Sequence, residues 1–223
     1  MGTLVKLKLY GHPFSSYCQK VFIALYENAT PFELRLLAPE EPQNSVEHAA
    51  LWPLKKMPVL VDGERTLVES SVIIEYLGLE HPGPVRLIPE ASPAALEVRM
   101  LDRCFDNYVM TPMQRIVFDF IRPAAERHPR TVAEGHELLD AAYRWLDDTL
   151  KGREWAAGDA FSLADCAAAP SLFYADWVQP IDAALANLKA YRQRLLARPS
   201  IARAVDEARP YRKNFPPGAP DRD

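Results

Sequence analysis

The sequence predicts two domains, a small α/β domain over residues 1–82 and an all-helical domain over residues 94–212. Period-two and helical patterns alternate in the first part of the chain, whereas helical patterns alone fill the second part. Between them, the proline-rich stretch HPGPVRLIPEASP lacks periodicity, which is typical of a linker, and we place this linker at residues 83–93. The last residues, 213–223, carry no helical pattern and are expected to form an extended or mobile tail.

The first domain begins with a strand, a helix and a second strand. Residues 5–9 read Val-Lys-Leu-Lys-Leu, an alternation that predicts a half-buried strand. Ser16 and Gln19 have the spacing of a capping box, so we expect a helix from Ser16 to Asn28. Alternation returns in residues 32–36 and predicts the second strand.

A hairpin and a helix complete the first domain. The Glu- and Pro-rich stretch before Met57 is expected to be a loop. The dipeptide Asp62-Gly63 then lies between two apolar runs and marks a tight turn between two strands. A helix is expected over residues 70–79. This order predicts a small mixed sheet covered by helices.

Helical periodicity defines the second domain. Ser92 is expected to cap its first helix, with Pro93 at the first helical position, and Thr131 with Glu134 has capping-box spacing. The predicted helices cover residues 94–109, 113–121, 131–150, 162–176, 181–196 and 200–208.

The segment FSLADC, residues 161–166, places an aspartate three residues after a serine. Ser162 and Asp165 fit a capping box, and Phe161 and Cys166 have the spacing of a hydrophobic staple. A catalytic Ser/Asp pair would also need a histidine base, and the sequence context singles out none of the histidines. The segment therefore predicts the start of a helix and not a catalytic centre.

Composition excludes several classes of partner. The net charge is −4, the pI is about 5.8, and no basic stripe is available to bind nucleic acid. Cys18, Cys104 and Cys166 are odd in number and widely spaced, which favours a reducing compartment over a disulfide framework. The start MGTLVKLKLYG lacks the apolar run of a signal peptide, and the apolar stretch CAAAPSLFYADWV is too short to span a bilayer. We therefore expect a cytoplasmic protein that binds neither nucleic acid nor membranes.

Four motifs in this order resemble those of the cytosolic glutathione S-transferase (GST) superfamily. SSYCQKVFIAL, residues 15–25, is similar to the serine-bearing first helix of the zeta and phi classes, and MPVLVDG resembles the loop whose proline is cis. ESS, residues 69–71, matches the acidic-serine pair that binds glutathione, and SLADCAAAP matches the capping segment of the second domain. The resemblance covers the chain apart from its tail and implies a thioredoxin-like domain (βαβ-ββα) followed by an all-α domain. Trp52 and the pair Tyr17-Cys18 depart from the family pattern, so we assign no class within these serine-type, bacterial-style members.

The resemblance also implies an enzyme, its co-substrate and its site. It implies a homodimeric glutathione transferase that adds the glutathione thiolate to a small hydrophobic electrophile and needs no metal. Ser15 takes the place of the hydroxyl that donates a hydrogen bond to the glutathione sulfur, with Tyr17 as second choice. The residues implied to contact glutathione are Lys56, Met57, Pro58, Glu69 and Ser70. Candidates for the electrophile site are Phe14, Tyr108, Met113, Phe118 and Tyr174.

Two other functions stay open at this point. On spacing alone, Ser15 and Ser16 are typical of simple helix caps. The first alternative function is an interaction module, because a GST-fold protein can serve as one, as some bacterial cell-division factors do with a C-terminal tail. The polar, proline-rich ending FPPGAPDRD suits that role. A thiol-disulfide oxidoreductase using Cys18 is the third hypothesis, although a cysteine without a partner thiol is more often a small buried side chain.

Overall fold

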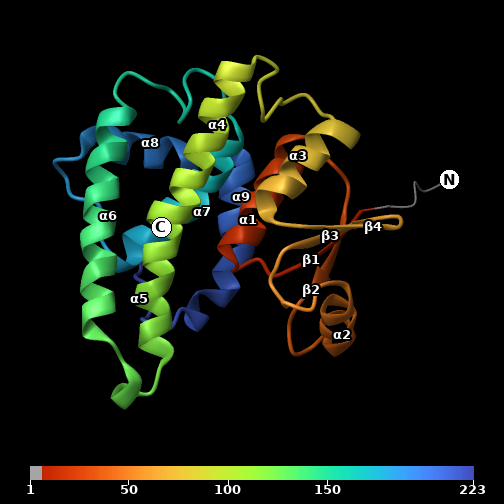
Figure 1. Ribbon diagram of the computed structural model, residues 1–223, viewed down its shortest axis with the longest axis horizontal. Coiled ribbons are helices and arrows are strands. Elements are labelled where there is room, and N and C mark those ends of the chain that lie inside the picture. The colour runs from red at the N-terminus through yellow and green to blue at the C-terminus, as the bar shows by residue number, and fades with distance from the viewer. Residues whose placement is uncertain (1–6) are drawn as a thin grey trace.

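A sheet-containing domain lies beside a bundle of helices in the computed structural model, which describes residues 7–223 (Figure 1). Within these residues one four-stranded sheet has the order β2-β1-β3-β4. The predicted α/β domain followed by an all-α domain is therefore confirmed. The start of the first predicted strand, residues 5–6, and the N-terminal stretch before it lie outside the described residues.

The sheet is mixed, as its sequence pattern predicts. β1 (Leu7–Gly11) pairs in parallel with β2 (Glu33–Leu36) and antiparallel with β3 (Val59–Asp62). β3 continues through the predicted Asp62-Gly63 turn into antiparallel β4 (Arg65–Val68), and Gly63 has the positive φ of 58° that this tight turn requires. Because β1 lies between two neighbours, its apolar side chains are sequestered from solvent and anchor the first domain.

Two helices of the first domain face the second domain, and a third lies away from it (Figure 1). α1 (Ser16–Glu27) packs against α3 (Ser70–Glu80) and against helices of the second domain. α2 (Pro42–Leu51) occupies part of the stretch that we expected to be a loop, so that expectation was wrong. The buried residues of α2 are the polar Asn44 and His48. We predict a helix from an apolar stripe at helical spacing, and α2 has no such stripe.

The start of α1 differs from the predicted capping box by one residue. Ser15, and not Ser16, is the N-cap, and its side chain accepts a hydrogen bond from the Cys18 backbone N–H at 3.5 Å. Gln19 does not reach back to a cap, because its side-chain amide donates to Pro13 O at 2.9 Å and to Tyr174 Oη at 3.0 Å. The tertiary contact with Tyr174 thus takes the side chain that local spacing assigned to the cap.

The second domain opens with one long helical stretch (Figure 1). α4 (Ser92–Cys104) runs through a π-helical segment, η1 (Phe105–Met110), into α5 (Thr111–Ile121), where we expected a break. A proline cannot donate a backbone hydrogen bond, and its ring crowds the carbonyl of the preceding turn. The wider π turn directly before Pro112 makes room for that ring and carries the helix on.

The remaining helices follow the predicted order with shifted ends. They are the 3-10 turn η2 (Ala124–Glu126), α6 (Pro129–Thr149), α7 (Leu163–Val178), α8 (Ala186–Ala197), α9 (Pro199–Ala208) and the 3-10 turn η3 (Arg209–Asn214). The predicted capping box of Ser162 and Asp165 is confirmed. Two predicted caps were wrong, because α4 begins at Ser92 after Ala91, and α6 begins at Pro129 before Thr131. A proline in the first helical turn sets both starts in place of a hydroxyl cap.

The C-terminal tail lies against the second domain. Phe215 is buried, and its ring lies 5.0 Å from that of Trp177 on α7. Arg222 forms an ion pair with Asp176 of the same helix, and Arg209 binds the side chain of Asp223. Our expectation of an extended or mobile tail left out the aromatic contact that Phe215 makes.

Among residues 7–223, no helix combines the length and the apolar character that crossing a membrane requires.

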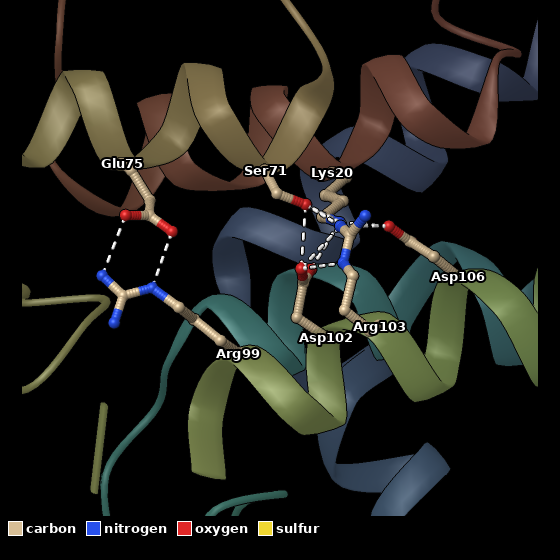
Figure 2. A network of polar contacts seen from close by, with 7 residues as sticks. All are labelled: Lys20, Ser71, Glu75, Arg99, Asp102, Arg103 and Asp106. Atoms are coloured by element: carbon tan, nitrogen blue, oxygen red, sulfur yellow. Dashed lines mark hydrogen bonds and ion pairs between the residues drawn. The ribbon is translucent and has the colours of Figure 1, made fainter. Parts of the chain in front are cut away.

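A buried charged cluster joins the two domains (Figure 2). Lys20 of α1 is 1% exposed, and its Nζ lies 2.5 Å from Asp102 Oδ1 and 2.8 Å from Asp106 Oδ2. Lys20 also donates a hydrogen bond to Ser71 Oγ of α3 at 2.8 Å. Arg103 Nη2 contacts both aspartates at 2.7 Å, so two cations balance two carboxylates. This cluster ties α1 and α3 to the α4–η1 stretch.

Replacing Lys20 by methionine should strongly destabilise the protein. The change leaves the buried Asp102 and Asp106 without the ammonium between them, and such a loss costs about 3–5 kcal/mol of unfolding free energy. Urea unfolding followed by circular dichroism measures the difference.

Arg130→Ala is the matched control, because the side chain of Arg130 is 92% exposed and pairs with Glu134 on the surface of α6. Its unfolding midpoint should stay near that of the wild type. Equal midpoints for Lys20→Met and Arg130→Ala would show that the cluster does not hold the domains together.

Candidate functional site

A cleft of about 610 Å³ lies between the two domains. One side is formed by the start of α1, the loop before β3 and the start of α3, and the other side by the α4–η1–α5 stretch. Eight of the candidate site residues line this cleft: Ser15, Tyr17, Lys56, Met57, Pro58, Glu69, Ser70 and Phe118. Residues far apart in the chain thus converge on one site.

Ser15 is placed at the cleft by the turn that joins β1 to α1. As the N-cap it has extended backbone angles, φ −83° and ψ 122°, and its backbone N–H donates to His12 O at 3.0 Å. Its hydroxyl accepts a hydrogen bond from Cys18 N–H, which leaves the hydroxyl proton free to be donated. The first amides of α1 lie beside it and favour negative charge. A thiolate placed here would be stabilised by the Ser15 hydroxyl and by the first amides of α1.

Tyr17 also lines the cleft, and its phenol stays protonated. Burial, reinforced by the nearby Asp106 carboxylate, raises the pKa of Tyr17 to about 12. Both hydroxyls are therefore available as hydrogen-bond donors at neutral pH.

The loop before β3 carries the Met57–Pro58 peptide bond, which is cis as the resemblance implies. The imidazole Nε2 of His48 lies 3.0 Å from the Lys56 carbonyl oxygen, and His48 itself is buried. Sequence reasoning missed this support because His48 lies on α2, the helix that we expected to be a loop. α2 therefore holds the loop that presents Lys56 and Met57 to the cleft.

Glu69 adopts an uncommon backbone conformation at the start of α3. It has φ 69° and ψ 111°, and a side chain in this region of φ costs roughly 1–3 kcal/mol unless surrounding contacts impose it. In the described chain its carboxylate makes no capping hydrogen bond to α3. Ser70, directly after it, is buried and opens the helix. Glu69 and Ser70 both line the cleft, and they lie at the N-terminal end of α3, where backbone amides are free to bind an anion.

Comparison with known proteins decides the family. The family model of the glutathione S-transferase N-terminal domain matches residues 9–85 of this chain, and the family model of the C-terminal domain matches residues 109–199. Glutathione S-transferase 3 of Zea mays is 31% identical over 215 residues, which cover 91% of this chain and 94% of the maize protein. The chain belongs to the glutathione S-transferase family.

Other relatives agree with this assignment. A probable maleylacetoacetate isomerase of Vibrio cholerae is 28% identical over 93% of this chain and 99% of its own length. The crystal structure of a glutathione S-transferase from Methylobacterium radiotolerans, in complex with glutathione sulfonate, matches with a TM-score of 0.77 at 30% identity. That match covers 89% of this chain and 94% of the other. The predicted fold, family and class of enzyme are confirmed.

The second-domain wall of this transferase is more polar than we expected. Arg103, Asp106, Asn107 and Gln114 line it together with Phe118. No local pattern points to these polar residues, because they become neighbours of the first domain only through the packing of the long α4–η1–α5 stretch. Burial raises the pKa of the Asp106 carboxyl, and the ammonium of Lys20 opposes that effect.

Four of the five candidates for the electrophile site lie elsewhere. Phe14 packs edge-on against Tyr174, and Tyr174 is buried in the core with its hydroxyl bonded to Phe14 O. Met113 is buried among core side chains, and the exposed Tyr108 lines an apolar groove between η1 and α6. None of these four residues lines the cleft. Tyr108, Met113 and Tyr174 lie on helical segments whose orientation a single sequence cannot give, and Phe14 lies in the turn before α1.

Cys18 is buried beneath the cleft in this transferase. It is 0% exposed, and burial raises the pKa of its thiol to about 11, although the Ser15 hydroxyl acts in the opposite direction. A thiol with so high a pKa carries little of the nucleophilic thiolate at neutral pH. These properties are those of a core side chain and disfavour the oxidoreductase hypothesis.

Alkylation of the native protein should distinguish the reactivity of Cys18 from that of Cys104. At pH 8 we expect iodoacetamide to label the partly exposed Cys104 while Cys18 stays unmodified, because Cys18 is inaccessible and protonated. Peptide mass spectrometry after a timed reaction gives the site of labelling. Rapid alkylation of Cys18 together with loss of activity would instead support thiol chemistry at this residue. Labelling in urea, where every thiol is exposed, is the control.

Proposed function

We propose that this transferase activates the thiol of bound glutathione at Ser15 and transfers the sulfur to a small electrophile held against the α4–η1–α5 wall. The observation that carries the proposal is the convergence, in one cleft, of Ser15, the cis Met57–Pro58 loop and the Glu69–Ser70 pair. The glutathione sulfonate in the Methylobacterium radiotolerans relative supports the same class of ligand.

The first-domain side of the cleft suits the parts of the tripeptide. Glu69 and Ser70, at the start of α3, hold the γ-glutamyl end, whose ammonium a carboxylate can bind and whose carboxylate helix amides can bind. The backbone of Met57 pairs with the cysteinyl unit, and Lys56 binds the glycyl carboxylate. This placement directs the cysteinyl sulfur to Ser15.

Activation of the thiol needs a modest free energy that Ser15 and α1 can supply. A free thiol has a pKa of about 8.5, so that about 3% is thiolate at pH 7, and lowering the pKa by about two units takes roughly 2.7 kcal/mol. A hydrogen bond to a charged acceptor contributes about 1.5–3 kcal/mol, and a helix N-terminus adds roughly 0.3–1 kcal/mol. Ser15 donates to the sulfur without losing its own proton, and the thiolate is the nucleophile.

The second-domain wall then holds the electrophile. An apolar body can rest on Phe118 and the Tyr17 ring, and a polar group can bond to Asn107 or Gln114. Holding both reactants in attack geometry lowers the entropic part of the barrier. Since the wall mixes aromatic and polar side chains, an electrophile that carries a hydrogen-bonding group suits it better than a purely apolar one.

Ser15→Ala should raise the pKa of the bound glutathione thiol by about one to two units, because one charge-assisted hydrogen bond is lost. The measurement is the ultraviolet absorbance of the thiolate as a function of pH, with glutathione at saturation. Tyr17→Phe is the matched variant, since it removes the second hydroxyl of the cleft and should leave this pKa close to the wild-type value. The reverse pattern would transfer the donor role to Tyr17.

We further propose that the protein is a homodimer in the reducing cytoplasm, where its free cysteines would persist. An apolar face on α3 and α4 supports dimerisation. Val72 and Leu79 flank Glu75 at helical spacing, and Leu96 lies one turn before Arg99, which pairs with Glu75. Val72, Leu79 and Leu96 are each more than half exposed, which is typical of a surface that a second copy covers.

Met100 is also exposed and lies one turn after Leu96 on α4, so it belongs to the same face. A double variant, Leu96→Glu with Met100→Glu, should dissociate this dimer, because four like charges would then meet at the interface of two copies. Sedimentation equilibrium should give half the wild-type mass. Val46→Glu, on an exposed position of α2 away from this face, is the control and should stay dimeric. A wild-type protein that sediments as a monomer would contradict the proposal directly.

A further inference from the structure

The turn that carries Ser15 is held by side chains from both domains. Gln19 Nε2 of α1 donates to Pro13 O at 2.9 Å and to Tyr174 Oη at 3.0 Å. Tyr174 Oη, on α7 of the second domain, donates in turn to Phe14 O at 3.0 Å. Gln19 is 2% exposed and Tyr174 is 3% exposed, so these bonds are shielded from water.

Each donated proton of this small network has one acceptor. The two amide protons of Gln19 go to Pro13 O and to Tyr174 Oη, and the single hydroxyl proton of Tyr174 goes to Phe14 O. The Tyr174 oxygen is thus acceptor and donor at once. Buried hydrogen bonds of this kind fix geometry, because breaking one leaves a polar group without water to replace its partner.

Tyr174 is itself held rigidly. Its ring meets that of Phe14 edge-on at 5.4 Å and that of Trp177 at 5.3 Å, and it stacks on Phe215 of the tail at 6.2 Å. α7, which carries it, starts at the capping box of Ser162. The second domain and the tail therefore set where the tyrosine oxygen lies.

We infer that Tyr174 is a positioning residue for Ser15, fixing across the domain interface the peptide unit that precedes the catalytic hydroxyl. Phe14 O belongs to the peptide that links Phe14 to Ser15, so its orientation sets where the Ser15 backbone, and with it the hydroxyl, is placed. This inference rests on the function proposed above. It gives Tyr174, first considered for the electrophile site, a different part in the reaction.

Tyr174→Phe tests the inference, since it keeps the ring and removes only the hydroxyl. We expect the pKa of the bound glutathione thiol to rise by about half a unit to one unit, and kcat at neutral pH to fall roughly threefold to tenfold. KM for glutathione should change little, because the residues proposed to bind the tripeptide are untouched. An unchanged thiol pKa would overturn the inference.

Tyr143→Phe is the matched control. Tyr143 is 1% exposed on α6, and its hydroxyl donates to Gln179 O at 3.1 Å, so the variant also loses one tyrosine hydrogen bond in the second domain. Both variants should lose similar stability in urea, whereas only Tyr174→Phe should shift the thiol pKa. Equal shifts of the thiol pKa in the two variants would show that general destabilisation causes the effect, and would overturn the inference.

A double-mutant cycle separates this inference from the proposed function. If Tyr174 acts through Ser15, adding Tyr174→Phe to Ser15→Ala should leave the thiol pKa at the Ser15→Ala value. A further rise in the double variant would overturn the positioning role. A shift for Ser15→Ala with none for Tyr174→Phe contradicts only the inference, whereas no shift for Ser15→Ala contradicts the proposed donor itself.

Discussion

The arrangement of the site depends on one interaction, the buried ion pairs of the Lys20 ammonium with Asp102 and Asp106. A charge removed from water is tolerated only when close partners replace its hydration, so α1 and the α4–η1 stretch cannot slide apart without exposing or unpairing it. Ser71 brings α3 to the same cluster. Because Ser15 precedes α1 and Ser70 opens α3, the cluster that locks these helices also sets the width of the cleft.

The chemistry is divided between the domains. The first domain lines the cleft with Ser15, the Met57–Pro58 loop and the Glu69–Ser70 pair, which we propose to bind glutathione, and the second domain lines it with mixed polar and aromatic side chains. The division is not complete, because Tyr174 of the second domain is hydrogen-bonded to the turn that carries Ser15. Two sets of buried contacts, one ionic at Lys20 and one neutral at Gln19 and Tyr174, thus join the halves of the site.

The elements predicted correctly are those with a strong local signal. The hairpin at Asp62-Gly63 and the start of α7 at Ser162 depend on turn and cap chemistry that acts within a few residues. α2 was missed because its buried side chains, Asn44 and His48, are polar and leave no apolar stripe to detect. The π segment before Pro112 was missed because a proline usually ends a helix, and no local pattern showed that a wider π turn would accommodate its ring.

By itself the sequence determined the fold class, the family and the residues that form the first-domain side of the cleft. Ser15, Met57, Pro58, Glu69 and Ser70 lie at helix starts or turns within short motifs. Only the tertiary structure decided the opposite wall, which Arg103, Asp106, Asn107 and Gln114 form, and the contact of Tyr174 with Phe14. The physical reason is the range of the interactions. Caps and turns are fixed by neighbours along the chain, whereas the direction in which a helix presents its side chains depends on what the whole molecule packs against it.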